Sequence, residues 1–179
     1  PDADKLYCEE IDCGEEGGAR QIASGLRHHY SEEEMLGKKV LVVANLKVSM
    51  TLTLDFIETF LYYFLLILFQ LKYLQAKNLV GFKSHGMVLC AVQVNEDGSE
   101  KVEFVEPPDG APLGEVVTFE GLPPPSPISA AQVEKKKVFT ACMDGMKTNN
   151  DCIGTWNGHV FMTSAGPCRG RTVKGGVMR

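Results

Sequence analysis

Short apolar runs separated by turn-forming clusters are the feature that most limits how this chain can fold. Lys39–Asn45 and Gly86–Val94 are rich in β-branched residues, and Leu6–Ile11 alternates apolar and polar positions. Runs this short, with a period of two, are typical of β-strands. Asn95–Gly98 is one of the turn clusters that stand between them. The sequence therefore predicts a mainly β protein.

Further short runs extend this pattern. Arg20–Ala23, Val102–Val105 and Glu115–Phe119 also have the character of strands, and Pro123–Pro127 is a stiff connector. Residues 134–179 add a few more strands separated by loops. A series of short strands favours a small β-barrel followed by a β-rich extension.

One short helix interrupts the strands. Ser31 and Glu34 have the S-x-x-E spacing of a capping box, and Gly37 is placed to end the helix after one or two turns.

Residues 52–74 are far more apolar than the rest of the chain, and Thr59–Phe69 is a run of eleven residues without a charge. A membrane span needs about twenty apolar residues, whereas Asp55, Glu58 and Lys72 interrupt this segment. A single crossing would also separate strands that belong to one barrel. A buried helix or hairpin is the plainer structural interpretation, and we expect a helical insert at 48–75.

The coding sequence offers another explanation of this segment. Val48-Ser49 can be encoded by GTAAGT, which is a strong splice donor, and Gln75 by CAG, which is an acceptor. A tract rich in T translates to the Phe, Leu and Tyr residues found between them. Residues 48–75 are therefore hypothesised to be a retained intron that is not part of the functional protein.

Charge is distributed unevenly along the chain. The net charge is −5, but residues 1–37 hold ten acids and three bases, so the remainder carries +2. Six cysteines and four histidines form no C-x-x-C pair and no zinc-like spacing. The sequence thus predicts no metal and no cofactor, thiols in a reducing compartment, and room for a basic surface that could attract phosphates.

Catalytic motifs are weak. Ser24 and Ser84-His85 have no acid at the spacing of a hydrolase triad. Gly14–Gly18 lacks the G-K-[ST] of a phosphate loop, and His28-His29 is too isolated for a metal site. A non-catalytic binding module is predicted.

Deleting 48–75 joins Lys47 to Ala76 and leaves the string NLKAKNLVGFKSHGMVLCA. This string closely resembles a segment of the tRNA-binding domain family. That family includes the endothelial monocyte-activating polypeptide II domain, the C-terminal domains of eukaryotic tyrosyl- and methionyl-tRNA synthetases, and the fungal tRNA-binding synthetase cofactor. The strings PDADKLYCEEIDCGE, RQIASGLRHHYSEEEM, KVEFVEPPDGAPLGEVVTFEG, EKKKVF and FMTSAGPCR are similar to other family segments, in the same order.

The resemblance implies an OB-fold barrel over residues 1–106, interrupted by the insert at 48–75, and a C-terminal extension over 107–179 that mimics a dimer interface. A monomer is therefore expected. The family's first barrel strand precedes the Pro-Asp-Ala-Asp loop, so that strand is expected to be missing from this sequence.

An OB-fold binds nucleic acid across a strand face and its flanking loops, with cations for phosphates and polar groups for sugars and bases. The matched motif then implies a set of tRNA-binding residues: Asn45, Lys47, Lys77, Lys83, Ser84, His85 and Met87, together with Arg20. Met87 is expected to be a core residue facing the site. Lys135–Lys137 and Arg169 are weaker candidates for backbone contacts.

The implied function is sequence-tolerant tRNA binding in the cytoplasm, in an aminoacyl-tRNA synthetase or a multisynthetase complex, without a membrane. The alternative is a protein-interaction or secreted cytokine-like module. It predicts partner binding that is insensitive to salt and no binding of RNA.

Overall fold

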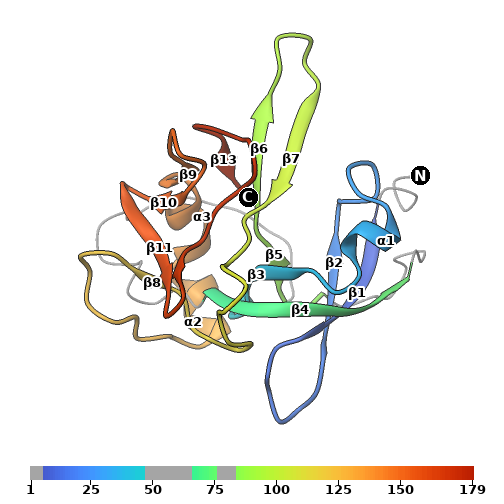
Figure 1. Ribbon diagram of the computed structural model, residues 1–179. Helices are drawn as coiled ribbons and strands as arrows, with labels where there is room; N and C mark the ends of the chain where they lie inside the picture. The colour runs from blue at the N-terminus through green and yellow to red at the C-terminus, as the bar shows by residue number, and fades with distance from the viewer. Residues whose placement is uncertain (1–5, 47–65, 76–83) are drawn as a thin grey trace.

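The computed structural model describes residues 6–46, 66–75 and 84–179, and for 66–75 it describes the backbone. These residues form two β-sheets side by side (Figure 1). The prediction of a mainly β fold is confirmed.

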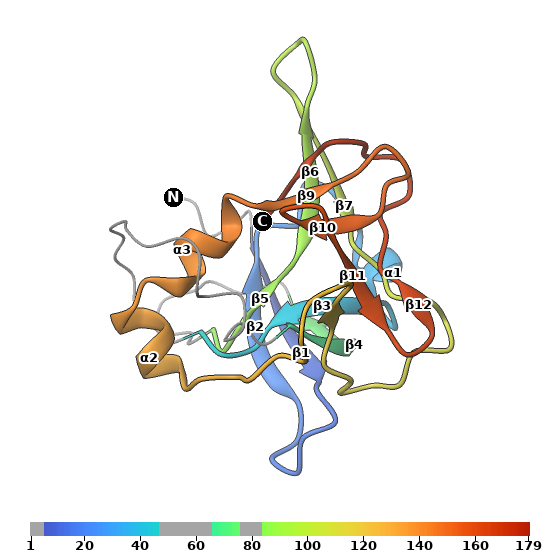
Figure 2. The same ribbon diagram turned by 90° about the vertical axis from the view of Figure 1, so that its left-hand side faces the viewer.

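The first sheet curls into half a barrel and has the strand order β2-β1-β4-β3-β5. Its strands are β1 (Tyr7–Asp12), β2 (Arg20–Ser24), β3 (Lys39–Val43), β4 (Leu66–Gln75) and β5 (Met87–Val88). β1 and β2 form an antiparallel hairpin in which Glu9 lies opposite Ile22. This hairpin extends from one end of the molecule, and the β6–β7 hairpin extends from the other (Figure 2).

The second sheet has eight strands, seven of them in the order β12-β11-β10-β9-β13-β6-β7, while β8 pairs with β11. Its strands are β6 (Cys90–Val94), β7 (Glu100–Phe104), β8 (Thr118–Phe119), β9 (Met146–Thr148), β10 (Gly154–Trp156), β11 (His159–Thr163), β12 (Gly166–Pro167) and β13 (Val177–Met178). Strands from both sides of residue 106 thus share one sheet. The boundary between 106 and 107 stays a prediction.

The expectation of a helical insert is wrong for its last ten residues. β4 lies between β1 and β3 and pairs antiparallel with both, with Gln75 opposite Cys8 and Leu66 opposite Val43. An open strand edge accepts an extended apolar segment, so pairing outweighs the helical tendency of this run. Among the described residues, no helix is long and apolar enough to cross a membrane. Residues 48–65 lie outside the described residues, and the intron hypothesis stays a hypothesis.

The predicted capping box is confirmed in α1 (Glu32–Met35). Glu34 N–H donates to Ser31 Oγ, and Ser31 N–H donates to the Glu34 carboxylate. Gly37 follows with a φ of +80°, which a glycine adopts without strain.

The sequence prediction missed two helices, α2 (Ala130–Lys135) and α3 (Val138–Met143). Val138 and Cys142, the buried residues of α3, are four positions apart, and Val133 is the buried residue of α2. An S-x-x-Q capping pair at Ser129 and Gln132, joined by a 3.2 Å bond from Ser129 N–H to Gln132 Oε1, marks the start of α2. The capping pair is visible in the sequence, but the lysines at 135–137 interrupt the apolar periodicity that would indicate two helices.

The loop before β13 is held by a buried carboxylate. Glu103 Oε2, on β7, accepts the N–H groups of Arg171 (2.9 Å), Thr172 (2.7 Å) and Val173 (3.0 Å). Glu103 is 7% exposed, and Lys101 Nζ lies 3.4 Å from its Oε1. Burial by itself would raise the pKa of Glu103, but the bonds from Thr172 and Val173 lower it to about 2. This carboxylate therefore fixes the C-terminal loop to the second sheet.

Candidate nucleic-acid interface

The candidate site lies where β2, the end of β3 and the segment leading into β5 meet. Two hydrogen bonds hold that segment beside β2: His85 N–H donates to Gln21 O (2.8 Å), and Ala23 N–H donates to Ser84 Oγ (3.1 Å). The structure thus brings the predicted residues Ser84 and His85 next to β2, which carries Arg20.

Arg20 joins three parts of the site. Its guanidinium forms an ion pair with Glu15 (2.6 Å) and donates to the carbonyl oxygens of Ala44 and of His85, the latter at 3.1 Å. The hydrogen bond to Glu15 raises the pKa of Arg20 and lowers that of Glu15. A guanidinium bonded in this way positions the loops around it. Its predicted contact with RNA stays a prediction.

Gly86 allows the segment to pack closely. A Cβ at this position would lie 2.9 Å from Ile22 Cδ1 and 3.0 Å from both Val42 Cγ1 and Val43 O. No larger residue fits without moving a strand. The Ser84 hydroxyl closes the turn by donating to Gly86 O at 2.9 Å. The backbone of this segment is therefore fixed.

The side chains of His85 and Met87 differ in exposure. The His85 ring is exposed, although its backbone is held on both sides. Met87 is half-buried and packs against the core. An exposed ring on a fixed backbone is suited to stacking on a base, whereas Met87 supports the site from below.

Asn45 connects the site to the C-terminal extension. Its side chain is 8% exposed, and its Nδ2 donates to Ile128 O at 3.2 Å. This bond spans 83 positions in sequence. Asn45 is therefore a structural link in this fold, and its predicted contact with tRNA stays untested.

The chain matches a known protein family over the part that contains this site. Residues 1–116 match the model of the family described as "Putative tRNA binding domain", and this range includes all the residues just described except Ile128. The chain belongs to the tRNA-binding domain family. The predicted resemblance is confirmed.

The relatives of this chain are much longer proteins, and the chain aligns with a part of each. The chain is 36% identical to a probable methionine–tRNA ligase of Oryza sativa subsp. japonica, and the match covers 100% of the chain and 18% of the ligase. It is 30% identical to the cytoplasmic tyrosine–tRNA ligase of Xenopus tropicalis over 98% of the chain and 27% of that protein. It is also 30% identical to the mouse aminoacyl tRNA synthase complex-interacting multifunctional protein 1, over 97% of the chain and 44% of that protein. The chain thus spans less than half the length of these relatives.

A solved structure supports the same fold. The crystal structure of the C-terminal domain of Plasmodium vivax p43 superposes with a TM-score of 0.70 at 30% identity. The match covers 100% of this chain and 88% of the p43 domain. Both sheets of this tRNA-binding domain therefore have a counterpart of known structure.

Three of the predicted cations, Lys47, Lys77 and Lys83, lie outside the described residues. Their contribution to the site of this tRNA-binding domain stays a prediction.

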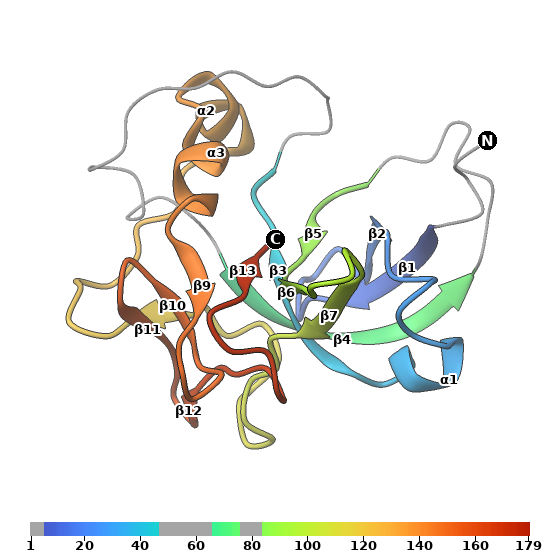
Figure 3. The ribbon, with the colours of Figure 1, turned by 90° about the horizontal axis from the view of Figure 1, so that it is seen from above.

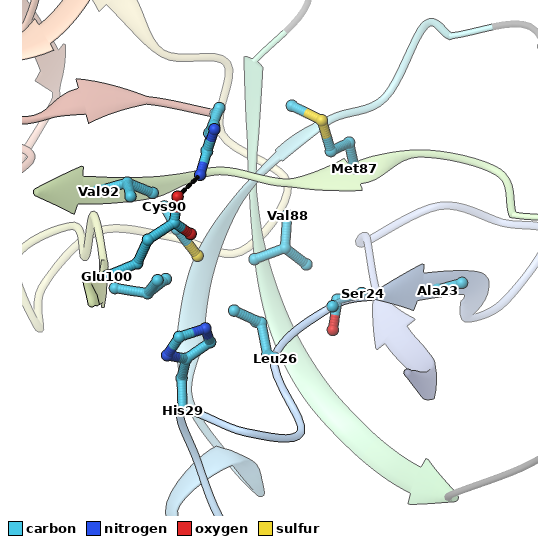
Figure 4. Close-up of a pocket in the computed structure, with 12 residues that line it drawn as sticks. Ala23, Ser24, Leu26, His29, Met87, Val88, Cys90, Val92 and Glu100 are labelled. Carbon is cyan, nitrogen blue, oxygen red and sulfur yellow. Dashed lines mark hydrogen bonds and ion pairs between the residues drawn. The ribbon is translucent and has the colours of Figure 1, made fainter. Parts of the chain in front are cut away.

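A cavity that no sequence pattern indicated lies beside the site. It has a volume of about 280 Å³, and Ser24, Leu26, His29, Met87 and Val88 are among the side chains that line it (Figure 4). The ion pair of Arg179 with Glu100 lies at its edge. The cavity opens between the end of β2 and the β6–β7 hairpin.

Glu9 is the residue least expected at this place. Its side chain is fully buried, and its Oε1 accepts the hydroxyl of Ser24, while Oε2 has no partner among the described residues. Burial raises the pKa of Glu9 to about 7. Glu9 lies on the same inward face of β1 as Tyr7 and Ile11, as the alternation along the strand requires.

Proposed function

We propose that this chain is a non-catalytic module that binds tRNA with little sequence preference and works in translation in the cytoplasm. The observation that carries the proposal is the family match over residues 1–116, which includes the fixed segment Ser84–Met87 beside β2. The cytoplasmic tyrosine–tRNA ligases among its relatives support the setting. A backbone held in this way presents ligand groups at little entropic cost.

We also propose that the module acts next to a synthetase, either within one chain or within a complex. Its relatives are tRNA ligases and a synthase complex-interacting protein, and it aligns with only a part of each. A weak RNA module beside a catalytic domain raises the effective concentration of tRNA there. Its own affinity can therefore be modest, and the module itself is proposed to be a monomer.

The test is binding of unfractionated tRNA at several salt concentrations. Counterion release predicts that affinity falls with a log–log slope of about 0.7 to 0.9 per neutralised phosphate. His85→Ala should weaken binding about threefold to tenfold through loss of stacking, without a change in the unfolding midpoint. Arg27→Ala, which removes an exposed side chain from the loop after β2, is the control.

Two results would contradict the proposal. Binding that is absent at low salt would exclude tRNA as the ligand. Binding that does not respond to salt would favour the protein-interaction alternative, for which a synthetase subunit is the partner to test.

A further inference from the structure

We infer that Lys135, Lys136 and Lys137, at the junction of α2 and α3, form a second phosphate-binding surface for the same tRNA. This inference rests on the proposed function and extends it from the half-barrel to the C-terminal extension. The partner is an RNA backbone, because adjacent ammonium groups attract phosphates without reading bases.

The first reason is position. Asn45, at the end of β3, is hydrogen-bonded to Ile128, which lies two residues before α2. α2 and α3 therefore stand on the side of the molecule where β3 ends and β5 begins (Figure 3). His85 lies in the segment that enters β5. A backbone that passes His85 could continue to the lysines.

The second reason is rigidity. Val133 from α2 and Val138 and Cys142 from α3 are 2% exposed or less. They belong to the same buried cluster as Leu41 and Val43 of β3. The buried residues of α2 and α3 thus share one core with β3, which anchors the lysine junction to that core.

The third reason is charge. Residues 121–143 contain a single acid, Glu134, and three lysines, in a chain whose net charge is −5. Lys135 and Lys137 have no ion-pair partner within the part of the chain that the structure describes. Five other cations of the described residues do form ion pairs, namely Arg20, Lys38, Lys101, Arg171 and Arg179. Ammonium groups that are not neutralised by carboxylates keep their attraction for phosphate.

The experiment compares two double variants of the full chain. Lys135→Ala/Lys136→Ala removes two exposed charges from the junction, and Lys147→Ala/Lys174→Ala removes two exposed charges from the second sheet and the loop before β13. Lys137 is left in place because its φ of +55° ends α2 and its side chain is half-buried. Circular dichroism and the unfolding midpoint verify that each variant folds.

The junction variant should bind unfractionated tRNA about fivefold or more weakly at low salt. Its log–log salt dependence should be less steep by about 1.4 to 1.8, which corresponds to two lost phosphate contacts. The control variant should change affinity less than twofold and keep the wild-type slope. If both variants lose affinity equally, or if the junction variant keeps the wild-type slope, the inference is overturned while tRNA binding stands. Absence of salt-dependent binding by the wild type would instead refute the proposed function, and this inference with it.

Discussion

Each of the two sheets buries one carboxylate, and the two behave in opposite ways. Glu103 in the second sheet accepts three backbone N–H groups and a hydroxyl, so it stays charged, with a pKa of about 2. Glu9 in the half-barrel has one hydroxyl partner and one oxygen without a partner among the described residues, and its pKa is about 7. The same side chain thus stabilises one sheet as an anion and fits the other as a neutral acid. Burial raises the pKa of both carboxylates, and the donors around Glu103 outweigh it, whereas the single hydroxyl beside Glu9 does not.

This contrast gives the two sheets opposite dependences on pH. For Glu103 the folded pKa lies below that of an unfolded glutamate, so its contribution is complete above about pH 4.5 and is lost as the pH falls towards 2. For Glu9 the folded pKa lies above the unfolded one, so stability is highest below about pH 4.5 and decreases as the pH rises to 7. Between about pH 4.5 and pH 7, Glu9 holds a proton in the folded protein that it has lost in the unfolded chain.

The largest expected effect is that of Glu103→Gln. The amide keeps the shape but not the charge that holds residues 171–173, so the free energy of unfolding at pH 7 should fall by about 3 kcal/mol. Urea denaturation measures it. Glu100→Gln, which changes an exposed carboxylate on the same strand, should alter stability by less than about 0.5 kcal/mol. A loss equal to that of this control would show that the donors around Glu103 contribute little.

Glu9→Gln should act in the other direction at high pH. At pH 8 the wild type must hold a charged carboxylate in an apolar interior, and the variant does not, so the variant should be more stable by about 2 to 3 kcal/mol. Near pH 4.5 the two should unfold within about 0.5 kcal/mol of each other. Thermal unfolding across this range measures the difference, with the exposed Glu10→Gln as control. A constant difference at all pH values would mean that Glu9 does not titrate in the folded protein.

The smallest expected effect is that of Lys101→Ala, which distinguishes the contribution of the ion pair of Glu103 from that of its hydrogen bonds. Lys101 lies 3.4 Å from Glu103 and its side chain is 47% exposed. A solvated pair of this kind contributes little, so Lys101→Ala should cost about 0.5 kcal/mol. The cost should shrink further in high salt. A loss close to that of Glu103→Gln, measured by the same denaturation, would assign the stabilisation to the ion pair and not to the backbone donors.

The features that the sequence predicted correctly are those encoded by local patterns. The strands β1, β2, β3, β6 and β7 coincide with the short strand-like runs of the sequence, and the helix α1 follows the capping box at Ser31 and Glu34. The family resemblance singled out Ser84 and His85, which the structure places beside β2, and their contact with tRNA stays a prediction. Each of these rests on neighbouring residues or on an order of motifs along the chain.

The features that escaped prediction depend on distant partners. Asn45 is bonded to a carbonyl 83 positions away, so its burial could not be read from its own segment. Residues 66–75 become a strand because β1 and β3 offer their edges, which no local propensity reveals. The placement of Lys47, Lys77 and Lys83 stays a prediction, since they lie outside the described residues.

The central position of β4 has a consequence for the order in which the chain folds. β1 and β2 are joined by a short turn and can pair as soon as both leave the ribosome, whereas Cys8 meets Gln75 only after the next fifty residues have been synthesised. Pairings of such high sequence separation form slowly. During synthesis the edge of β1 that will pair with β4 therefore stays unpaired until β4 has been made. Over that interval the open edge of β1 can pair with other extended segments before β4 reaches it.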